Sequence, residues 1–232
     1  MAQLDGDSDR INIAIDGPAG AGKSTVARLV AGQLGYVYID TGAMYRAVTF
    51  SAQRLSISAE QHEPLSQLMQ SIRIELEPGE RGQSVFVNGE DVTDKIRSRE
   101  VTVQVSYFAA SGVVRSVLSR MQRDLAVRKG VVMDGRDIGT HVLPNAELKI
   151  FLTASVRDRA LRRFNELGDN AAITLDQLES EIAERDRLDE GREISPLIRA
   201  TDAIELDSSG MTIEEVVSSI VQLSRTKLAE AK

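Results

Sequence analysis

The chain has 232 residues, of which 42% are hydrophobic and 27% are charged. This length suits one compact domain with a sizeable insertion, and the apolar content is sufficient for a core, which excludes a disordered or fibrous protein. The absence of cysteine excludes disulfides, thiolate metal sites and cysteine nucleophiles. Two isolated histidines, His62 and His141, argue against a histidine-rich metal centre.

The charge balance limits the partners. The formal net charge is −7, which argues against general affinity for nucleic acid because such binding needs an excess of Lys and Arg. Residues 1–10 are acidic without the apolar stretch of a secretory signal, and no later run reaches about 18 apolar residues. We therefore expect a soluble, cytoplasmic protein with no membrane or nucleic-acid partner. Because no heptad pattern or repeat is present, a monomer is the default expectation.

The first predicted elements alternate between strand and helix. Residues 11–15 form a β-branched run, and residues 24–34 then show helical spacing of apolar side chains. A second short strand is expected at residues 36–40, before a helix that ends near Arg54. Further apolar strands are expected at residues 131–133, 148–152 and 203–206. Each is followed by polar residues and a helical pattern, which is typical of a parallel sheet covered by helices on both faces.

An insertion separates the second and third of these strands. The interval from residue 40 to residue 131 is far longer than the roughly 30 residues of a βαβ unit. Within it, residues 72–76 and 84–87 alternate with period two around a Pro-Gly turn, which predicts a small antiparallel hairpin. Helical spacing from Val113 to Val127 predicts a helix that returns the chain to the sheet.

Residues 17–24 match the pattern G-x-x-x-x-G-K-[ST] between a predicted strand and a predicted helix. The glycines let backbone N–H groups converge on phosphate oxygens, and the helix N-terminus adds partial positive charge. Lys23 can reach the terminal phosphates, and the Ser24 hydroxyl can ligate Mg²⁺. The pattern in this context predicts a nucleoside triphosphate site rather than a glycine-rich turn without a ligand.

The loop alone does not identify the reaction. A GTPase is disfavoured, because no guanine-reading Asn/Thr-Lys-x-Asp element follows the strand at residues 148–152. A motor or transporter ATPase is usually larger, although Asp134 at the end of a strand fits a Walker-B carboxylate. A regulatory nucleotide switch and a nucleotide-binding scaffold without turnover also stay open at this point.

The distribution of arginines along the chain favours an enzyme that transfers a phosphoryl group to a small acceptor, because bringing two anionic substrates together requires concentrated positive charge. The chain has 22 arginines and six lysines. Arg46, Arg115 and Arg136 follow predicted strands or begin the return helix. A further group crowds the helix after residue 152 and consists of Arg157, Arg159, Arg162 and Arg163. That group is a candidate lid over the transferred phosphoryl group, the alternative being a solvated helix face. The predicted catalytic residues are Lys23, Arg157, Arg159 and Arg162.

Several motifs in order resemble those of bacterial cytidylate kinases, within the nucleoside monophosphate kinases. They are I-D-G-P-A-G-A-G-K-S-T at 15–25, D-T-G-A-M-Y-R at 40–46, D-G-R-D-I-G-T at 134–140, L-K-I-F-L-T-A at 148–154, R-A-L-R-R at 159–163 and E-R-D-R-L-D-E-G-R at 184–192. The chain departs slightly from the commonest pattern, with Ser24 where some members have glycine and Thr41 where others have serine. Ser24 is a better Mg²⁺ ligand than glycine and Thr41 keeps the hydroxyl of serine, so neither departure weakens the resemblance.

The resemblance implies a P-loop α/β core at residues 11–40 and 131–232, with a lid at about 155–190. Residues 41–130 would form a monophosphate-binding insertion with a small antiparallel sheet, and residues 1–10 a flexible acidic extension. The implied activity is transfer of the γ-phosphoryl group of ATP to CMP or dCMP with Mg²⁺ as cofactor. The alternatives are a kinase for UMP or another monophosphate and, less favoured, a regulatory NTPase.

The resemblance also implies site residues. ATP would be bound by Gly17, Pro18, Ala19, Gly20, Ala21, Gly22, Lys23, Ser24 and Thr25, with Ser24 as the Mg²⁺ ligand. CMP would be bound by Thr41, Arg46, Ser106, Arg115, Arg136, Asp137, Arg185, Asp189 and Arg192. Within this set Arg46, Arg136 and Arg185 would hold the acceptor phosphate. Ser106, Arg115 and Asp137 would read cytosine, and Asp189, assisted by Arg185, would contact the ribose.

Overall fold

The computed structural model describes residues 10–79, 82–167 and 173–230. Its larger sheet has five strands in the order β2-β6-β1-β7-β8, and every neighbouring pair is parallel. The strands are β1 Asn12–Asp16, β2 Val37–Asp40, β6 Val131–Gly135, β7 Leu148–Thr153 and β8 Ile204–Asp207. β1 and β6 are buried at every position, as central strands of a sheet covered on both faces must be. The expected parallel α/β fold is confirmed.

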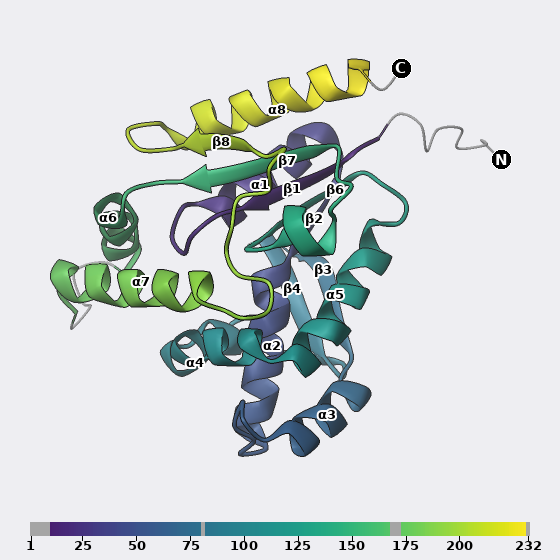
Figure 1. Ribbon diagram of the computed structural model, residues 1–232, viewed down its shortest axis with the longest axis vertical. Coiled ribbons are helices and arrows are strands. Elements are labelled where there is room, and N and C mark those ends of the chain that lie inside the picture. Colours follow the sequence, from purple (N-terminus) through teal and green to yellow (C-terminus); the bar gives the residue numbers. More distant parts are fainter. Residues whose placement is uncertain (1–9, 80–81, 168–172, 231–232) are drawn as a thin grey trace.

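Helices cover both faces of this sheet (Figure 1). In chain order the α-helices of the described residues are α1 Lys23–Leu34, α2 Thr41–Arg54, α3 His62–Ser71, α4 Arg99–Ala110, α5 Gly112–Ala126, α6 Val156–Leu167, α7 Leu175–Glu190 and α8 Ile213–Glu230. α1 and α8 share one apolar cluster with the sheet, which includes Val30, Ile150 and Ile220. On the other face, the end of α5 packs against β6 through Ala126 and Met133.

The inserted segment has a core of its own below the large sheet (Figure 1). Its antiparallel sheet has the order β3-β4-β5, formed by β3 Ile74–Gly79, β4 Gly82–Val87 and β5 Glu90–Asp91, and is followed by the 3₁₀ helix η2 Lys95–Arg97. Leu65, Phe108 and Leu118 join α3, α4 and α5 in one buried cluster. The predicted hairpin and return helix are therefore present.

Gln83 joins the small sheet to the large one. Its Nε2 donates to the Tyr38 carbonyl at 2.7 Å, and its Oε1 accepts from the Asp40 N–H at 3.0 Å. β2 is an edge strand, so the backbone groups on its outer side have no strand to pair with. The side-chain amide of Gln83 forms hydrogen bonds with two of these groups. The insertion is thus attached directly beside the start of α2.

α6 and α7 pack against each other through Ala160, Leu178 and Ile182. They correspond to the lid expected at about residues 155–190, of which residues 168–172 lie outside the described residues. Of the acidic extension predicted at residues 1–10, only Arg10 lies inside them.

One expectation about the elements was wrong, and two helices were not expected. A helix was predicted after each strand, but β6 is followed only by the π-helical turn η3 Ile138–Val142 before β7 begins. The chain has to cross only β1 to reach β7, so a short connection is sufficient. Pro144 also prevents the turn from continuing as a helix. The unexpected helices are α3 and α4.

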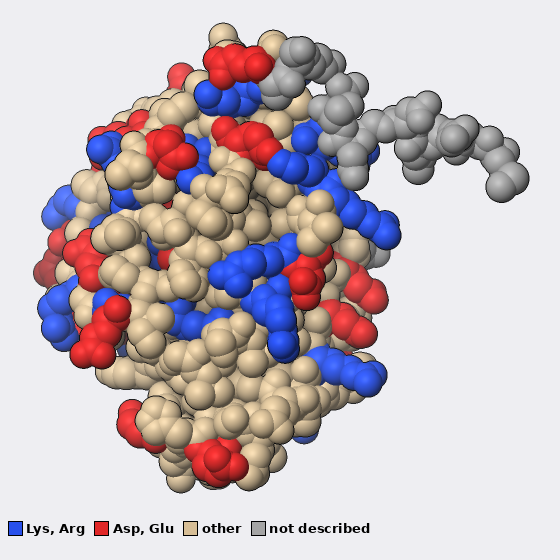
Figure 2. Space-filling view, turned by 45° about the vertical axis from the view of Figure 1, so that its right-hand side comes forward, with Lys and Arg blue, Asp and Glu red and all other residues tan. Residues whose placement is uncertain are grey.

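Among the described residues, no single helix is long and apolar enough to cross a membrane. α4 and α5 pass such a test only when taken together, and they are bent by 93°. Both contribute buried side chains to the core of the insertion. On the face shown in Figure 2, acidic and basic side chains are interspersed.

Candidate active site

A cavity of about 550 Å³ lies at the carboxyl ends of β1 and β6, where α/β sheets place their ligand sites. Its walls come from the loop before α1, the start of α2, α4, α5 and the α6–α7 pair. The predicted residues that line it are Ala19, Gly20, Ala21, Gly22, Lys23, Ser24, Thr25, Thr41, Arg46, Ser106, Arg115, Arg136, Asp137, Arg162, Arg185, Asp189 and Arg192. Those that do not are Gly17, Pro18, Arg157 and Arg159.

The loop before α1 has the backbone that a phosphate cradle requires. Gly17 has φ +147°, and a Cβ there would lie 2.0 Å from the Leu152 carbonyl oxygen, so only glycine fits. Gly22 takes the left-handed conformation as the N-cap of α1, with φ 87°. The N-terminus of α1 therefore lines the cavity with its free N–H groups and partial positive charge.

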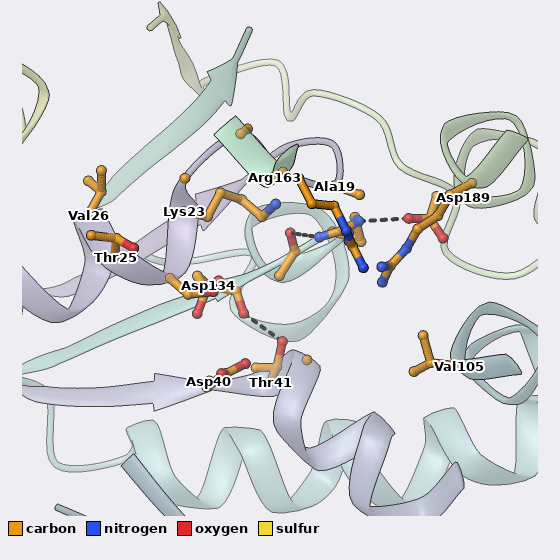
Figure 3. Close-up of a pocket in the computed structure, with 18 of the residues that line it drawn as sticks. Ala19, Lys23, Thr25, Val26, Asp40, Thr41, Val105, Asp134, Arg163 and Asp189 are labelled. Atoms are coloured by element: carbon orange, nitrogen blue, oxygen red, sulfur yellow. Dashed lines mark hydrogen bonds and ion pairs between the residues drawn. The ribbon is translucent and has the colours of Figure 1, made fainter. Parts of the chain in front are cut away.

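Lys23 is buried at the first position of α1, and its Nζ donates to the Pro18 carbonyl at 2.6 Å. Burial, together with repulsion from Arg136, lowers the pKa of Lys23 well below its ordinary value. A polyphosphate in the cavity would supply the missing negative charge. Figure 3 shows Lys23 and Arg163 extending toward the same space.

Two arginines of the predicted lid group, Arg157 and Arg163, lie on different sides of α6. Arg157 is exposed and pairs with Glu179 at 3.4 Å, whereas Arg163 lines the cavity. Six positions turn an α-helix by about 600°, so these two side chains leave the helix roughly 120° apart. The structure therefore does not place Arg157 in the site, whereas Arg163, from the same predicted group, lines the cavity together with Arg162.

Arg159 and Arg162 stabilise the phosphate loop through hydrogen bonds to its carbonyl groups. Arg159 is buried, donates to the Ala19 carbonyl at 2.9 Å and pairs with Asp186 of α7 at 2.7 Å. Arg162 donates to the Ala21 carbonyl at 3.3 Å and also lines the cavity. Both guanidinium groups thus satisfy loop carbonyls, which leaves the loop N–H groups to face a ligand.

Ser24 and Asp134 form the donor set that suits Mg²⁺. Ser24 Oγ donates to Asp134 Oδ2 at 2.8 Å, and the Tyr38 hydroxyl donates to Oδ1 at 3.0 Å. Burial and the nearby Asp40 raise the pKa of Asp134 to about 7. Hydroxyl and carboxylate oxygens are ligands that Mg²⁺ prefers, and a cation would relieve this repulsion. No cluster of three or more His, Cys, Asp or Glu occurs among the described residues, so nucleotide phosphates would have to complete the coordination.

Arg46 and Arg185 present positive charge that lacks a close acidic partner. Among the described residues, neither guanidinium lies within ion-pairing distance of a carboxylate. Burial lowers the pKa of Arg46 to about 10, and burial with repulsion from Arg136 lowers the pKa of Arg185 to about 9. Both arginines line the cavity. Two such arginines in one cavity suit an anion that carries more than one charge.

Asp189 organises the cations on the opposite wall. It is 1% exposed, accepts from Arg136 Nε at 2.8 Å and from Ser106 Oγ at 3.2 Å, and pairs with Arg192. Burial alone would raise the pKa of Asp189, but Arg136 and Arg192 outweigh it and hold the pKa below the ordinary value. These pairs bring the ends of α4, β6 and α7 together.

Arg115 and Asp137 form a buried ion pair at the far end of the cavity, with side chains only 3% and 5% exposed. Arg115 also donates to the Ala109 carbonyl at 3.1 Å, and its guanidinium lies 5.6 Å from the centre of the Tyr45 ring. The pair offers donors and acceptors side by side in a dry environment. Such a site discriminates planar ligands by their hydrogen-bonding edge.

Sequence reasoning missed three residues that line this end, Tyr45, Val105 and Ala109. Ala109 lies three positions after Ser106 on α4 and Val105 lies four positions before Ala109, so helical spacing from Ser106 was the available signal. Tyr45 lies next to Arg46, but a buried aromatic residue on a helix is equally typical of a core. Burial raises the pKa of Tyr45 to about 12, so its hydroxyl keeps its proton.

Comparison with known proteins identifies the family. The cytidylate kinase family profile matches residues 13–226. This chain belongs to the cytidylate kinase family. A cytidylate kinase of Bacillus cytotoxicus is 56% identical over 92% of this chain and 96% of its own length, and one of Bacillus cereus strain G9842 is 54% identical over the same shares. An uncharacterised protein of Eubacterium ventriosum has a similar fold, with a TM-score of 0.53 at 11% identity over 94% of this chain and 99% of that one.

Family membership makes the chain an ATP-dependent phosphotransferase of the P-loop class. The matches span both the phosphate loop and the inserted segment, and therefore both ends of the cavity. They give no support to a regulatory nucleotide switch or a scaffold without turnover.

Proposed function

We propose that this cytidylate kinase family member transfers the γ-phosphoryl group of ATP to CMP or dCMP, which yields CDP or dCDP and ADP. The observation that carries the proposal is the arrangement of one cavity, with a phosphate loop at one end, a buried Arg–Asp pair at the other and arginines between them. Two anionic nucleotides meeting in this cavity would approach each other phosphate first.

The phosphate loop and Lys23 bind the ATP phosphates, and Arg46, Arg136 and Arg185 bind the acceptor phosphate. The lowered pKa values of Lys23 and Arg185 support this assignment, because both reflect burial of positive charge among other cations. Binding of phosphate removes that repulsion. Mg²⁺, held by Ser24 and Asp134 with the nucleotide, would neutralise charge on the transferred group.

The hydrogen-bonding groups at the Arg115–Asp137 end of the cavity complement cytosine. Its edge shows an amino donor beside ring acceptors, which complements the Asp137 carboxylate, the Arg115 guanidinium and the Ser106 hydroxyl. Uracil carries a carbonyl oxygen where cytosine carries its amino group. Asp137 would then face an oxygen without a hydrogen bond, which would weaken binding by about 1–3 kcal/mol. Asp189, assisted by Arg185 and paired with Arg192, holds the ribose between base and phosphate.

No general base is needed, because a nucleoside monophosphate near neutral pH is already a dianion and attacks through a phosphate oxygen. The chain contributes position and charge. Arg162 and Arg163 line the cavity on the lid side and are placed to contact the transferred phosphoryl group. Arg159 acts through the loop that it supports.

A coupled assay of ADP formation with CMP, dCMP, UMP, AMP and GMP offered separately tests the proposal. We expect stoichiometric diphosphate formation with CMP and dCMP, and lower kcat/KM with UMP by about tenfold or more. Faster turnover with another monophosphate would reassign the substrate. Slow ATP hydrolysis that ignores every acceptor would reject the proposal.

A further inference from the structure

The carboxylate of Asp16 is a buried charged group that the proposed reaction does not use. It ends β1 immediately before the phosphate loop and is 5% exposed. It makes no ion pair with any described residue within 4 Å. A buried carboxylate without a cation must be held by hydrogen bonds, and the partners it takes therefore indicate its role.

Both oxygens of Asp16 accept backbone N–H groups of the turn η3. Oδ1 accepts from Ile138 at 2.8 Å, and Oδ2 accepts from Gly139 at 2.7 Å. These are the two N–H groups that directly follow Asp137. The carbonyl of Asp137 then accepts the N–H groups of His141 and Val142 at 2.9 and 3.1 Å. Asp16 thus supplies acceptors to the first N–H groups of the turn that Asp137 begins.

The fit between Asp16 and the turn is close. A Cβ on Gly139 would lie 3.4 Å from Asp16 Oδ2 and 3.1 Å from Lys149 Cδ. β1 and β6 are also paired directly at this level, with Asp16 opposite Gly135. The position of the turn is therefore set by the end of β1.

Asp137 depends on this support. It lies beyond the end of β6, has φ −142° and ψ 27°, and makes no side-chain cap to the turn it precedes. Its carboxylate contacts Arg115 instead. A shift of the following peptide would move Asp137 relative to Arg115, since those two N–H groups are the next ones along the chain.

We propose that Asp16 is a positioning residue for nucleobase selection, which holds the Asp137 turn so that Asp137 stays paired with Arg115 and presents its carboxylate to cytosine. The inference rests on the proposed function. Asp16 therefore lies where the two substrate sites meet, because it contacts the turn after Asp137 and also directly precedes the phosphate loop. The matching pair of backbone contacts explains why a carboxylate rather than an amide occupies this position.

Asp16→Asn tests the inference, because the amide matches the carboxylate in size but turns one accepting oxygen into an NH₂ group that opposes an N–H. We expect the ratio of kcat/KM for CMP to kcat/KM for UMP to fall about tenfold, the effect of one misplaced hydrogen bond, while the KM for ATP stays close to that of the wild type. Steady-state kinetics with both acceptors measures this ratio.

Asn12→Ala is the matched control. Asn12 lies on the same strand and the same face as Asp16, is also buried, and donates to the Ala126 carbonyl at 3.0 Å. Loss of this hydrogen bond should lower the free energy of unfolding without changing the ratio of kcat/KM for CMP to kcat/KM for UMP. Gly139→Ala perturbs the same contact from the other partner and should reproduce the loss of selectivity.

The outcomes separate the two proposals. If the wild type does not phosphorylate CMP, the proposed function fails. If the wild type prefers CMP and both Asp16→Asn and Gly139→Ala keep that preference, the positioning role fails. Equal losses of ATP and CMP binding in both variants, or failure of both to fold, would assign Asp16 to stability alone and would also contradict the inference.

Discussion

At the scale of single residues, the cavity holds more positive charge than its own carboxylates neutralise. Asp189 pairs with Arg136 and Arg192, and Asp137 pairs with Arg115. Arg46 and Arg185, in contrast, have no carboxylate within ion-pairing distance among the described residues. Concentrating cations without bound anions is costly, and phosphate binding recovers that cost. This is the physical reason to expect strong dependence of catalysis on individual cations.

Replacing Lys23 by alanine should lower kcat by roughly 10³-fold or more, because the transferred phosphoryl group loses its nearest loop cation. Folding should be retained, since the change also removes a buried charge with a depressed pKa. Steady-state turnover with saturating ATP and CMP, together with a melting curve, measures both effects. Near-normal turnover in the folded variant would show that Lys23 does not act on the reaction.

The α6 arginines can be distinguished by a pair of variants. Arg163→Ala should lower kcat with CMP roughly ten- to a hundredfold, a rise of about 1.4–2.7 kcal/mol in the activation free energy, because Arg163 lines the cavity. Arg157→Ala removes only an exposed pair with Glu179 and should leave kcat almost unchanged. The reverse ranking would restore Arg157 as the lid residue and would imply a conformation in which α6 has turned.

Asp16 also predicts a pH effect on stability. Burial raises its pKa from 3.8 to about 6, only partly offset by the N–H groups of Gly139 and Ile138. The native state therefore binds this proton more tightly than the unfolded state, and its contribution to stability is lost as pH rises between about 4 and 6. Asp16→Asn removes the titration, so its stability relative to the wild type should increase over that range, by about 1.4 kcal/mol per pKa unit.

Urea denaturation of both unliganded proteins at about pH 4.5 and pH 6.5 provides the measurement. A stability difference that stays constant between the two pH values would contradict the raised pKa of Asp16.

The site residues differ in how far sequence could predict them. The phosphate loop was predictable because its chemistry lies in eight consecutive residues, 17–24. The positions of Arg157 and Arg159 outside the cavity were not, since the direction of each α6 side chain depends on how the helix packs. Arg159 illustrates this, because its pairing with Asp186 on α7 turns it toward the loop carbonyls. The same holds for Asp16, whose partners are about 120 residues away in the chain.

At the scale of elements, the parallel strands were predictable because continuous apolar runs need burial on both faces. α4 was not expected, and its sequence at residues 101–105 alternates valine with polar residues as a strand would. Ser98 caps the helix by accepting from the Val101 N–H, and the buried cluster with Phe108 favours the helix. Tertiary packing thus outweighs local propensity in α4.

Gln83 gives the insertion its attachment, which predicts a local effect. Gln83→Ala should remove the two bonds to Tyr38 and Asp40 and cost about 1–2 kcal/mol. Hydrogen exchange should accelerate at the amides of β3 and β4, whereas those of β1 and β6 stay protected. Gln177→Ala on α7, whose contacts are local, serves as a control for loss of a glutamine amide. Equal acceleration in all strands would mean that Gln83 supports the whole fold instead.

At the scale of the whole molecule, two cores converge on one cavity. The sheet with α1 and α8 carries the phosphate loop, the insertion carries Arg46 and Ser106, and α7 brings Arg185 and Asp189 between them. Phosphoryl transfer therefore requires that both nucleotides occupy this cavity at once, with their phosphates adjacent. Catalysis then follows from position and charge.

The most direct test of that requirement is a crystal structure with CMP, Mg²⁺ and a non-hydrolysable ATP analogue. We expect the cytosine edge against Asp137 and Arg115, and the CMP phosphate among the arginines on the Lys23 side of the cavity. CMP bound outside the cavity, or with its base at the phosphate loop, would contradict the account.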